Sequence, residues 1–129
     1  MELVFVYGTL KSGERASWLM SGHGEKVCDG AVTGRLIDLG AFPGLLTDSD
    51  GDVFGEVWLV EEYSIAALDQ YEGEGVLYDR IRAEVRCADG NLLNCWTYRY
   101  RSQGGKHLEI EGGTWVSKKS LNPIDSECR

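Results

Sequence analysis

Residues 78–100 contain two strand-like segments on either side of Asp89-Gly90, a dipeptide typical of two-residue hairpin turns. In the first segment apolar side chains alternate with charged ones. The apolar members are Ile81, Ala83 and Val85, and the charged members are Arg80, Arg82, Glu84 and Arg86. A period of two is that of a β-strand with one buried face. The pattern therefore predicts an antiparallel hairpin, with strands over 78–86 and 92–100, whose apolar face other elements must cover.

The remaining segments predict more strands and one clear helix. Residues 3–6 are continuously apolar and rich in β-branched side chains, which suits a central strand that is buried on both faces. Residues 31–39 and 53–60 predict two further strands, joined through Gly40, Pro43-Gly44 and the Asp-rich turn at 48–52. From Ser64 the apolar period becomes helical, and Gly73 is a natural end for that helix. We therefore expect an α+β domain in which roughly five or six strands curl into a small barrel with one or two packed helices.

Length and composition favour a single domain over residues 1–129. The chain has 129 residues, of which 43% are hydrophobic, and no linker-like segment divides it. We expect the core to cover about residues 2–116. Residues 101–129 carry two Gly-Gly pairs and predict a surface-draped segment that ends in disorder, with the C-terminal tail over about 117–129.

Charge and cysteine content limit the partners and the compartment. The 13 basic and 21 acidic residues give a net charge of -8, which repels nucleic acid and anionic membranes, so neither is an expected partner. The apolar start is too short for a signal peptide, and no run of eighteen apolar residues follows, so we expect a cytoplasmic protein. Because the domain is small and acidic and shows no additional apolar stripe, we expect a monomer. The cysteines are scattered without a C-x-x-C pair and are interpreted as reduced thiols: Cys28, Cys87, Cys95 and Cys128.

The Asp89-Gly90 turn also sets an expected register for two of these cysteines. A two-residue turn would place Cys87 opposite Leu92 and Cys95 opposite Glu84. Cys87 and Cys95 are therefore not expected to be cross-strand partners.

The turn that follows residues 3–6 is the first candidate site. It reads Tyr7-Gly8-Thr9-Leu10-Lys11-Ser12-Gly13. A buried strand that opens into a glycine-containing turn can bring successive backbone amides together, and such a group of donors suits a carboxylate or an oxyanion. Gly8 would let a ligand approach the backbone. An ordinary strand-to-loop turn is the alternative interpretation.

Glu72 is the second candidate. Its helical phase puts it on the face of Ile65 and Leu68, whereas Asp69 falls off that face. Desolvation and the negative end of the helix dipole would both raise the pKa of Glu72 and make it a candidate general base. The alternative is a frayed last turn with Glu72 exposed.

Four blocks together resemble a known family. They are Val6-Tyr7-Gly8-Thr9-Leu10-Lys11, Val53-Phe54-Gly55-Glu56-Val57, Leu68-Asp69-Gln70-Tyr71-Glu72 and Tyr78-Asp79-Arg80. In this order and spacing, residues 3 to about 100 resemble the gamma-glutamylcyclotransferase-like family, above all the gamma-glutamylamine cyclotransferases and their small bacterial and plant relatives. A weaker match follows at residues 110–115.

The resemblance implies both an activity and a set of site residues. The family's fold is a small barrel, and its reaction is intramolecular attack of an alpha-amino group on a gamma-glutamyl amide, which releases 5-oxoproline and a free amine without metal or cofactor. By this resemblance Tyr7, Gly8, Thr9 and Leu10 would form the substrate-binding loop, Glu72 would be the acid/base, and Tyr98 matches a family tyrosine near the pocket. The partner would be a small gamma-glutamyl substrate.

Two departures from the family concern the site of the leaving amine. The glutamylamine enzymes often carry an Asn a few residues after a Lys-x-Gly, where this chain has Glu14-Arg15-Ala16. Residues 73–75 also differ.

Other function classes have less support. A Ser or Cys hydrolase would need a nucleophile with a positioned base, but the chain has no G-x-S-x-G, and His23 and His107 lie in polar, glycine-flanked segments. Gly22-His23-Gly24 lacks the third glycine of a dinucleotide-binding loop, because Val27 stands in its place. A non-catalytic module of the same fold that binds a small ligand or a protein stays open.

Overall fold

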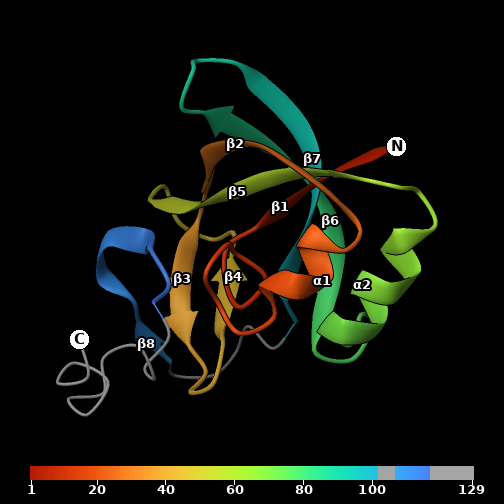
Figure 1. Cartoon of the computed structure of the whole chain (residues 1–129). Coiled ribbons are helices and arrows are strands. Elements are labelled where there is room, and N and C mark those ends of the chain that lie inside the picture. Colours follow the sequence, from red (N-terminus) through yellow and green to blue (C-terminus); the bar gives the residue numbers. More distant parts are fainter. Residues whose placement is uncertain (102–106, 117–129) are drawn as a thin grey trace, which may run out of the picture.

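The structure is a computed structural model that describes residues 1–101 and 107–116 (Figure 1). Within these residues eight strands form one sheet, accompanied by two α-helices and one 3-10 turn. The strands are β1 (Glu2–Val6), β2 (Gly24–Thr33), β3 (Arg35–Asp38), β4 (Pro43–Leu46), β5 (Asp52–Val60), β6 (Tyr78–Cys87), β7 (Leu92–Tyr100) and β8 (Leu108–Glu109). The helices are α1 (Ser17–Ser21) and α2 (Ser64–Glu72), and the 3-10 turn is η1 (Glu111–Gly113). Neither α-helix of the described part is long and apolar enough to cross a membrane.

Five of the strands close into a barrel, as predicted. The sheet order is β1-β5-β2-β6-β7-β4-β3-β8, and an additional pairing of β1 with β7 joins the ends of the first five. At the closing point Val4 pairs with Trp58 of β5 on one side and, in parallel, with Trp96 of β7 on the other. The strands β4, β3 and β8 extend the sheet beyond β7, where Leu45 pairs with Arg99. Closure of this ring removes free edges from the barrel.

The strand β1 is buried on both faces, which confirms the prediction from its continuous apolar run. Val4 and Val6 belong to one hydrophobic cluster, which also contains the buried apolar residues of α1 and α2. Phe5 and Tyr7 belong to a second cluster on the other face. Because β1 ends between the two clusters, the turn after it emerges at the wall of the core.

The predicted strand over 31–39 is wrong in its extent, because two strands occupy this region. The strand β2 already begins at Gly24, and β3 starts after Gly34. A Cβ on Gly34 would lie 2.5 Å from the backbone oxygen of Leu46, so the close approach of β4 requires a glycine where the chain leaves β2. The strand β4 was expected to be a loop, but all four of its residues are buried.

The hairpin of β6 and β7 has the predicted strands but a different register. Arg86 pairs with Leu92 and Ala83 pairs with Cys95, one residue away from the predicted pairs. The amide of Cys87 donates to the carbonyl of Asn91, so the turn contains more residues than Asp89-Gly90.

Cys87 and Cys95 are not cross-strand partners, as expected, but Cys87 has another neighbour. Its Sγ lies 2.9 Å from Sγ of Cys28 on β2, and both are free cysteines. The periodicity of single strands gave no sign of this contact, because the pairing of β2 with β6 creates it.

The prediction of a surface-draped tail is wrong for Trp115. This side chain is 3% exposed and belongs to the same hydrophobic cluster as Phe5 and Tyr7. The amide of Ile110 donates to the carbonyl of Leu36, which ties the segment to β3. The expected C-terminal tail over about 117–129 lies outside the described residues.

Candidate active site

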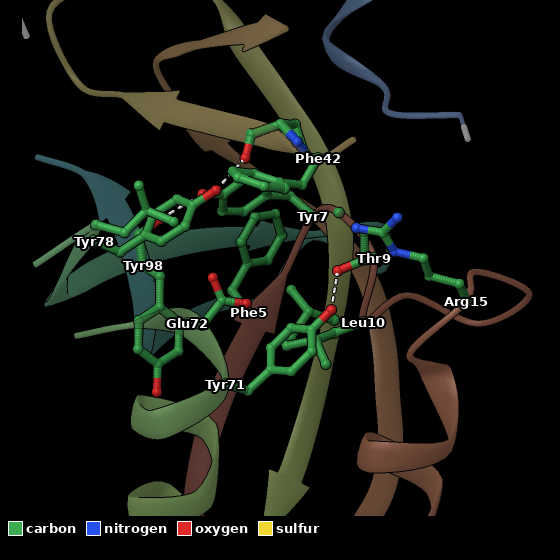
Figure 2. A pocket seen from close by; sticks show the side chains of 14 residues that line it. Phe5, Tyr7, Thr9, Leu10, Arg15, Phe42, Tyr71, Glu72, Tyr78 and Tyr98 are labelled. Carbon is green, nitrogen blue, oxygen red and sulfur yellow. Dashed lines mark hydrogen bonds between the residues drawn. The ribbon is translucent and has the colours of Figure 1, made fainter. Parts of the chain in front are cut away.

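A pocket opens where β1 ends, between the turn after that strand, the last turn of α2 and the first residues of β4 (Figure 2). The space between its lining residues, together with the open solvent at its mouth, amounts to about 540 Å³. It is lined by Phe5, Val6, Tyr7, Gly8, Thr9, Leu10, Arg15, Phe42, Pro43, Tyr71, Glu72, Leu77, Tyr78 and Tyr98. All six predicted site residues, which are Tyr7, Gly8, Thr9, Leu10, Glu72 and Tyr98, therefore lie around one pocket.

The turn after β1 lines this pocket with residues whose backbone amides have no partner in the described part of the chain. The amide of Lys11 donates to the carbonyl of Gly8, and the amide of Ala16 donates to the carbonyl of Thr9, so the turn is held by its own carbonyl groups. Within residues 1–101 and 107–116, the amides of Gly8, Thr9 and Leu10 donate to no other residue. Amides held in this way can bind an anion.

Gly8 is required for a reason that the sequence did not show. A Cβ on Gly8 would lie 2.7 Å from Cγ and 2.9 Å from Cδ of Pro43, at the start of β4. The proline ring cannot move aside as a flexible side chain could. The absence of a side chain at Gly8 therefore lets β4 close one wall of the pocket, in addition to leaving the backbone open to a ligand.

A buried glutamate anchors the same turn from behind. Glu56 of β5 is 8% exposed, and its Oε1 accepts hydrogen bonds from the amide of Ser12 at 2.9 Å and from Nε1 of Trp58 at 3.1 Å. Lys11, the next residue after the Y-G-T-L string, is directed elsewhere, because its Nζ donates to the carbonyl of Trp115. Through these contacts the block Val53-Phe54-Gly55-Glu56-Val57 supports the turn after β1, although the two are far apart in the sequence.

Glu72 is the last residue of α2, and its side chain faces the pocket, which contradicts the alternative of an exposed, frayed end (Figure 2). Ile65 and Leu68, on the same face of the helix, are buried in the core. Gly73 ends the helix in the left-handed conformation with φ 65°, as its position predicts. Burial raises the pKa of Glu72 from 4.5 to about 7. In the described part of the chain no hydrogen bond or ion pair holds this carboxyl group.

Three tyrosines form the scaffold of the pocket through their hydroxyl groups. Tyr7 donates to the carbonyl of Tyr98 at 2.6 Å and accepts from the amide of Leu45 at 3.1 Å. Tyr78 donates to the carbonyl of Pro43 at 2.5 Å. Burial raises the pKa of Tyr7, Tyr78 and Tyr98 above the usual tyrosine value, so none of them is a base near neutral pH. Tyr98 is predicted from the family resemblance as a residue near the pocket, whereas Tyr78 belongs to one of the four resembling blocks but is not among the predicted site residues.

Asp69 falls off the apolar face of α2, but it is not free in solvent. Its Oδ1 accepts from the hydroxyl of Tyr98 at 2.7 Å and from Nε of Arg80 at 2.8 Å. These bonds attach α2 to β6 and β7 and so fix the helix that carries Glu72. Asp69 and Arg80 both lie in blocks that the sequence comparison had picked out, although their contact could not be read from it.

Two further lining residues also escaped the sequence reasoning. The hydroxyl of Tyr71 lies 2.7 Å from Oγ1 of Thr9, which links the end of α2 to the turn after β1. Arg15 projects from the segment before α1 towards the Thr9 side of the pocket (Figure 2). The only sequence signal for Arg15 was that it lies where the family pattern changes.

The fold and the pocket together define a class: small closed barrels that carry one unpaired carboxyl group beside an amide-lined turn. The comparisons with known proteins identify the group within that class. The profile of the family described as "Gamma-glutamyl cyclotransferase, AIG2-like" matches residues 4–117, and the chain belongs to this family.

Three proteins illustrate the range of the similarity. A Vibrio cholerae protein whose name proposes gamma-glutamylcyclotransferase activity is 35% identical over 117 residues, which cover 90% of this chain and 96% of the relative. The gamma-L-glutamyl-butirosin B gamma-glutamyl cyclotransferase of Niallia circulans is 34% identical, over 89% of this chain and 76% of that enzyme. An AIG2-like protein from Mus musculus has the same fold, with a TM-score of 0.82, 24% identity, and coverage of 97% of this chain and 92% of the mouse chain.

Proposed function

We propose that the protein is a gamma-glutamyl cyclotransferase in which Glu72 moves the protons. The observation that carries the proposal is the position of Glu72, a desolvated carboxyl group without a partner in the described residues, in the same pocket as the open amides of residues 8–10. In the reaction the alpha-amino nitrogen attacks the gamma-carbonyl carbon, and the bond from that carbon to the leaving nitrogen then breaks. The products are 5-oxoproline and a free amine.

The raised pKa of Glu72 supports its role as the base. The alpha-ammonium group has a pKa of about 8 or higher, so an ordinary glutamate would be a base weaker by at least roughly 3.5 units, or about 5 kcal/mol. With the pKa of Glu72 at about 7 instead of 4.5, this mismatch in pKa shrinks by about 2.5 units. Glu72 takes a proton from the ammonium group and passes it to the leaving nitrogen. The second proton lost by the attacking nitrogen goes to water or to the released amine.

The turn after β1 would bind the non-reacting end of the substrate. The amides of Gly8, Thr9 and Leu10 suit the alpha-carboxylate of the glutamyl group, or the oxygen of the tetrahedral intermediate if that atom comes within hydrogen-bond distance. Because nucleophile and carbonyl belong to one molecule, holding the chain of the substrate in a folded pose is itself a large part of catalysis. The rings of Phe5 and Tyr98 would exclude water from this pose.

The proposal is tested by incubating the purified protein with gamma-glutamyl amines, gamma-glutamyl dipeptides and glutathione, and by measuring 5-oxoproline by mass spectrometry. Glu72→Gln keeps the shape of the side chain but cannot accept the proton, and we expect it to lose at least about 100-fold in kcat. Glu62→Gln, an exposed acid just before α2, is the matched control and should act as the parent. Full activity in Glu72→Gln would refute the role of Glu72. Binding of these compounds without any turnover would instead favour a non-catalytic module of the same fold.

A further inference from the structure

The pocket contains one basic and one acidic residue. Among its lining residues Arg15 is the only basic side chain and Glu72 is the only acidic one; the rest are apolar, aromatic or uncharged. In Figure 2 the guanidinium group of Arg15 and the carboxyl group of Glu72 lie on opposite sides of the pocket. The pocket therefore has one ionisable group on each of two opposite sides.

Arg15 is exceptional among the arginines of the chain. The other arginines in the described residues all form ion pairs: Arg35, Arg80, Arg82, Arg86, Arg99 and Arg101. Arg15 is exposed and has no hydrogen-bond or ion-pair partner within residues 1–101 and 107–116. Arg15 is therefore a pocket-lining cation whose guanidinium group no residue of the described part of the chain occupies.

The neighbouring cations are already used by the fold. Lys11 donates to the carbonyl of Trp115 at 2.9 Å, and Arg80 binds Asp69 at 2.8 Å. An anionic part of a ligand that enters this pocket would therefore find one free guanidinium group. The planar guanidinium matches a carboxylate with two parallel hydrogen bonds.

We propose that Arg15 binds a carboxylate on the leaving amine, so that the substrates are gamma-glutamyl amino acids or peptides rather than simple gamma-glutamyl amines. This inference rests on the proposed function. The reacting carbonyl must lie beside Glu72, and the amides of Gly8, Thr9 and Leu10 are open for the glutamyl carboxylate. Arg15 is exposed and stands across the pocket from Glu72, so a leaving group that extends from the reacting carbonyl towards solvent would reach its guanidinium group.

Two matched substrates test the inference. Gamma-glutamyl-alanine and gamma-glutamyl-ethylamine differ only in the carboxylate of the leaving amine. We expect the parent protein to prefer gamma-glutamyl-alanine in kcat/KM. Arg15→Gln should lose about 5- to 10-fold in kcat/KM for gamma-glutamyl-alanine, the scale of a well-oriented charge pair near solvent, and should leave gamma-glutamyl-ethylamine within about 2-fold. Arg15→Lys should recover part of the loss, and Arg101→Gln, an exposed arginine that does not line the pocket, is the control.

The pattern of losses separates the possible outcomes. Equal losses for both substrates in Arg15→Gln would mean that Arg15 binds the glutamyl end, and no loss would mean that it binds neither end; each overturns the inference while the proposed function stands. If no substrate yields 5-oxoproline, the proposed function fails. In that case the affinities of both compounds for the parent and for Arg15→Gln, measured by calorimetry, test the role of Arg15 separately. Tighter binding of gamma-glutamyl-alanine than of gamma-glutamyl-ethylamine by the parent, lost in Arg15→Gln, supports the contact with the carboxylate. Equal affinities of the parent for the two compounds refute it.

Discussion

The desolvated state of Glu72 predicts that the protein loses stability as pH rises, and that Glu72→Gln removes this loss. In the unfolded chain the carboxyl group has a pKa near 4.5, whereas in the folded protein burial raises the pKa to about 7. Below pH 4.5 both states carry the proton, so the group contributes no pH dependence. Between these values the unfolded state has released the proton and the folded state still holds it, so the free energy of unfolding falls by about 1.4 kcal/mol per pH unit. The total loss is about 3 kcal/mol, complete above pH 7.

The assay is urea unfolding of the parent and of Glu72→Gln at several values between pH 4.5 and pH 8.5. Other titrating groups are common to both proteins and cancel in the difference. As pH rises across this range, the free energy of unfolding of Glu72→Gln should increase by about 3 kcal/mol relative to that of the parent. At an m-value of about 1.5 kcal/mol/M, this difference separates the two urea midpoints by about 2 M more at the high-pH end than at the low-pH end. Glu62→Gln, on an exposed position, should run parallel to the parent. Parallel curves for Glu72→Gln as well would refute the claim that the folded protein disfavours the charged form of this carboxyl group.

Three further predictions concern the pH profile of activity, the packing of Gly8 and the reactivity of Cys28. If Glu72 is the base, kcat/KM should rise with pH and level off near pH 7, so a profile without a bend between pH 6 and 8 would exclude that role. Gly8→Ala should destabilise the fold by about 1–3 kcal/mol in urea unfolding, because the new Cβ would meet the ring of Pro43 at 2.7 Å; unchanged stability would contradict this packing. Burial and the contact with Cys87 raise the pKa of Cys28 to about 12, so peptide mapping after brief maleimide treatment at pH 7 should find little label on Cys28; rapid labelling would contradict it.

The helix that carries Glu72 could be predicted from the sequence because it is long enough to show a period. Ile65, Leu68 and Glu72 share one face over nine residues, and Gly73 marks the end. The helix α1 has only five residues, too few for a helical period to stand out. The strand β4 has four residues, all buried, so alternation could not reveal it either.

The polar contacts of the pocket depend on pairings between distant parts of the chain. Asp69 meets Arg80 and Tyr98 because β6 and β7 pair side by side and α2 packs against them, with Arg80 directly opposite Tyr98 in the register. The one-residue error in the predicted hairpin register would have put a different residue opposite Tyr98. Similarly, the contact between Gly8 and Pro43 depends on where β4 joins the sheet, which no local pattern in residues 40–46 indicates.

Asp69 and Glu72 show how one helix can hold two carboxyl groups for different purposes. Asp69 accepts hydrogen bonds from Arg80 and Tyr98, which fixes it as a charged anchor for the helix. Glu72, one turn later, meets apolar and aromatic groups and no donor among the described residues, an arrangement that costs stability near neutral pH. A hydrogen-bond donor placed beside Glu72 would recover that stability, because it would stabilise the charged carboxylate. It would also lower the pKa of Glu72, and so move this pKa away from the pKa of the ammonium group that Glu72 must deprotonate. The unpaired state of Glu72 is therefore what the proposed chemistry requires, and a variant that supplies Glu72 with a basic partner should be more stable and less active.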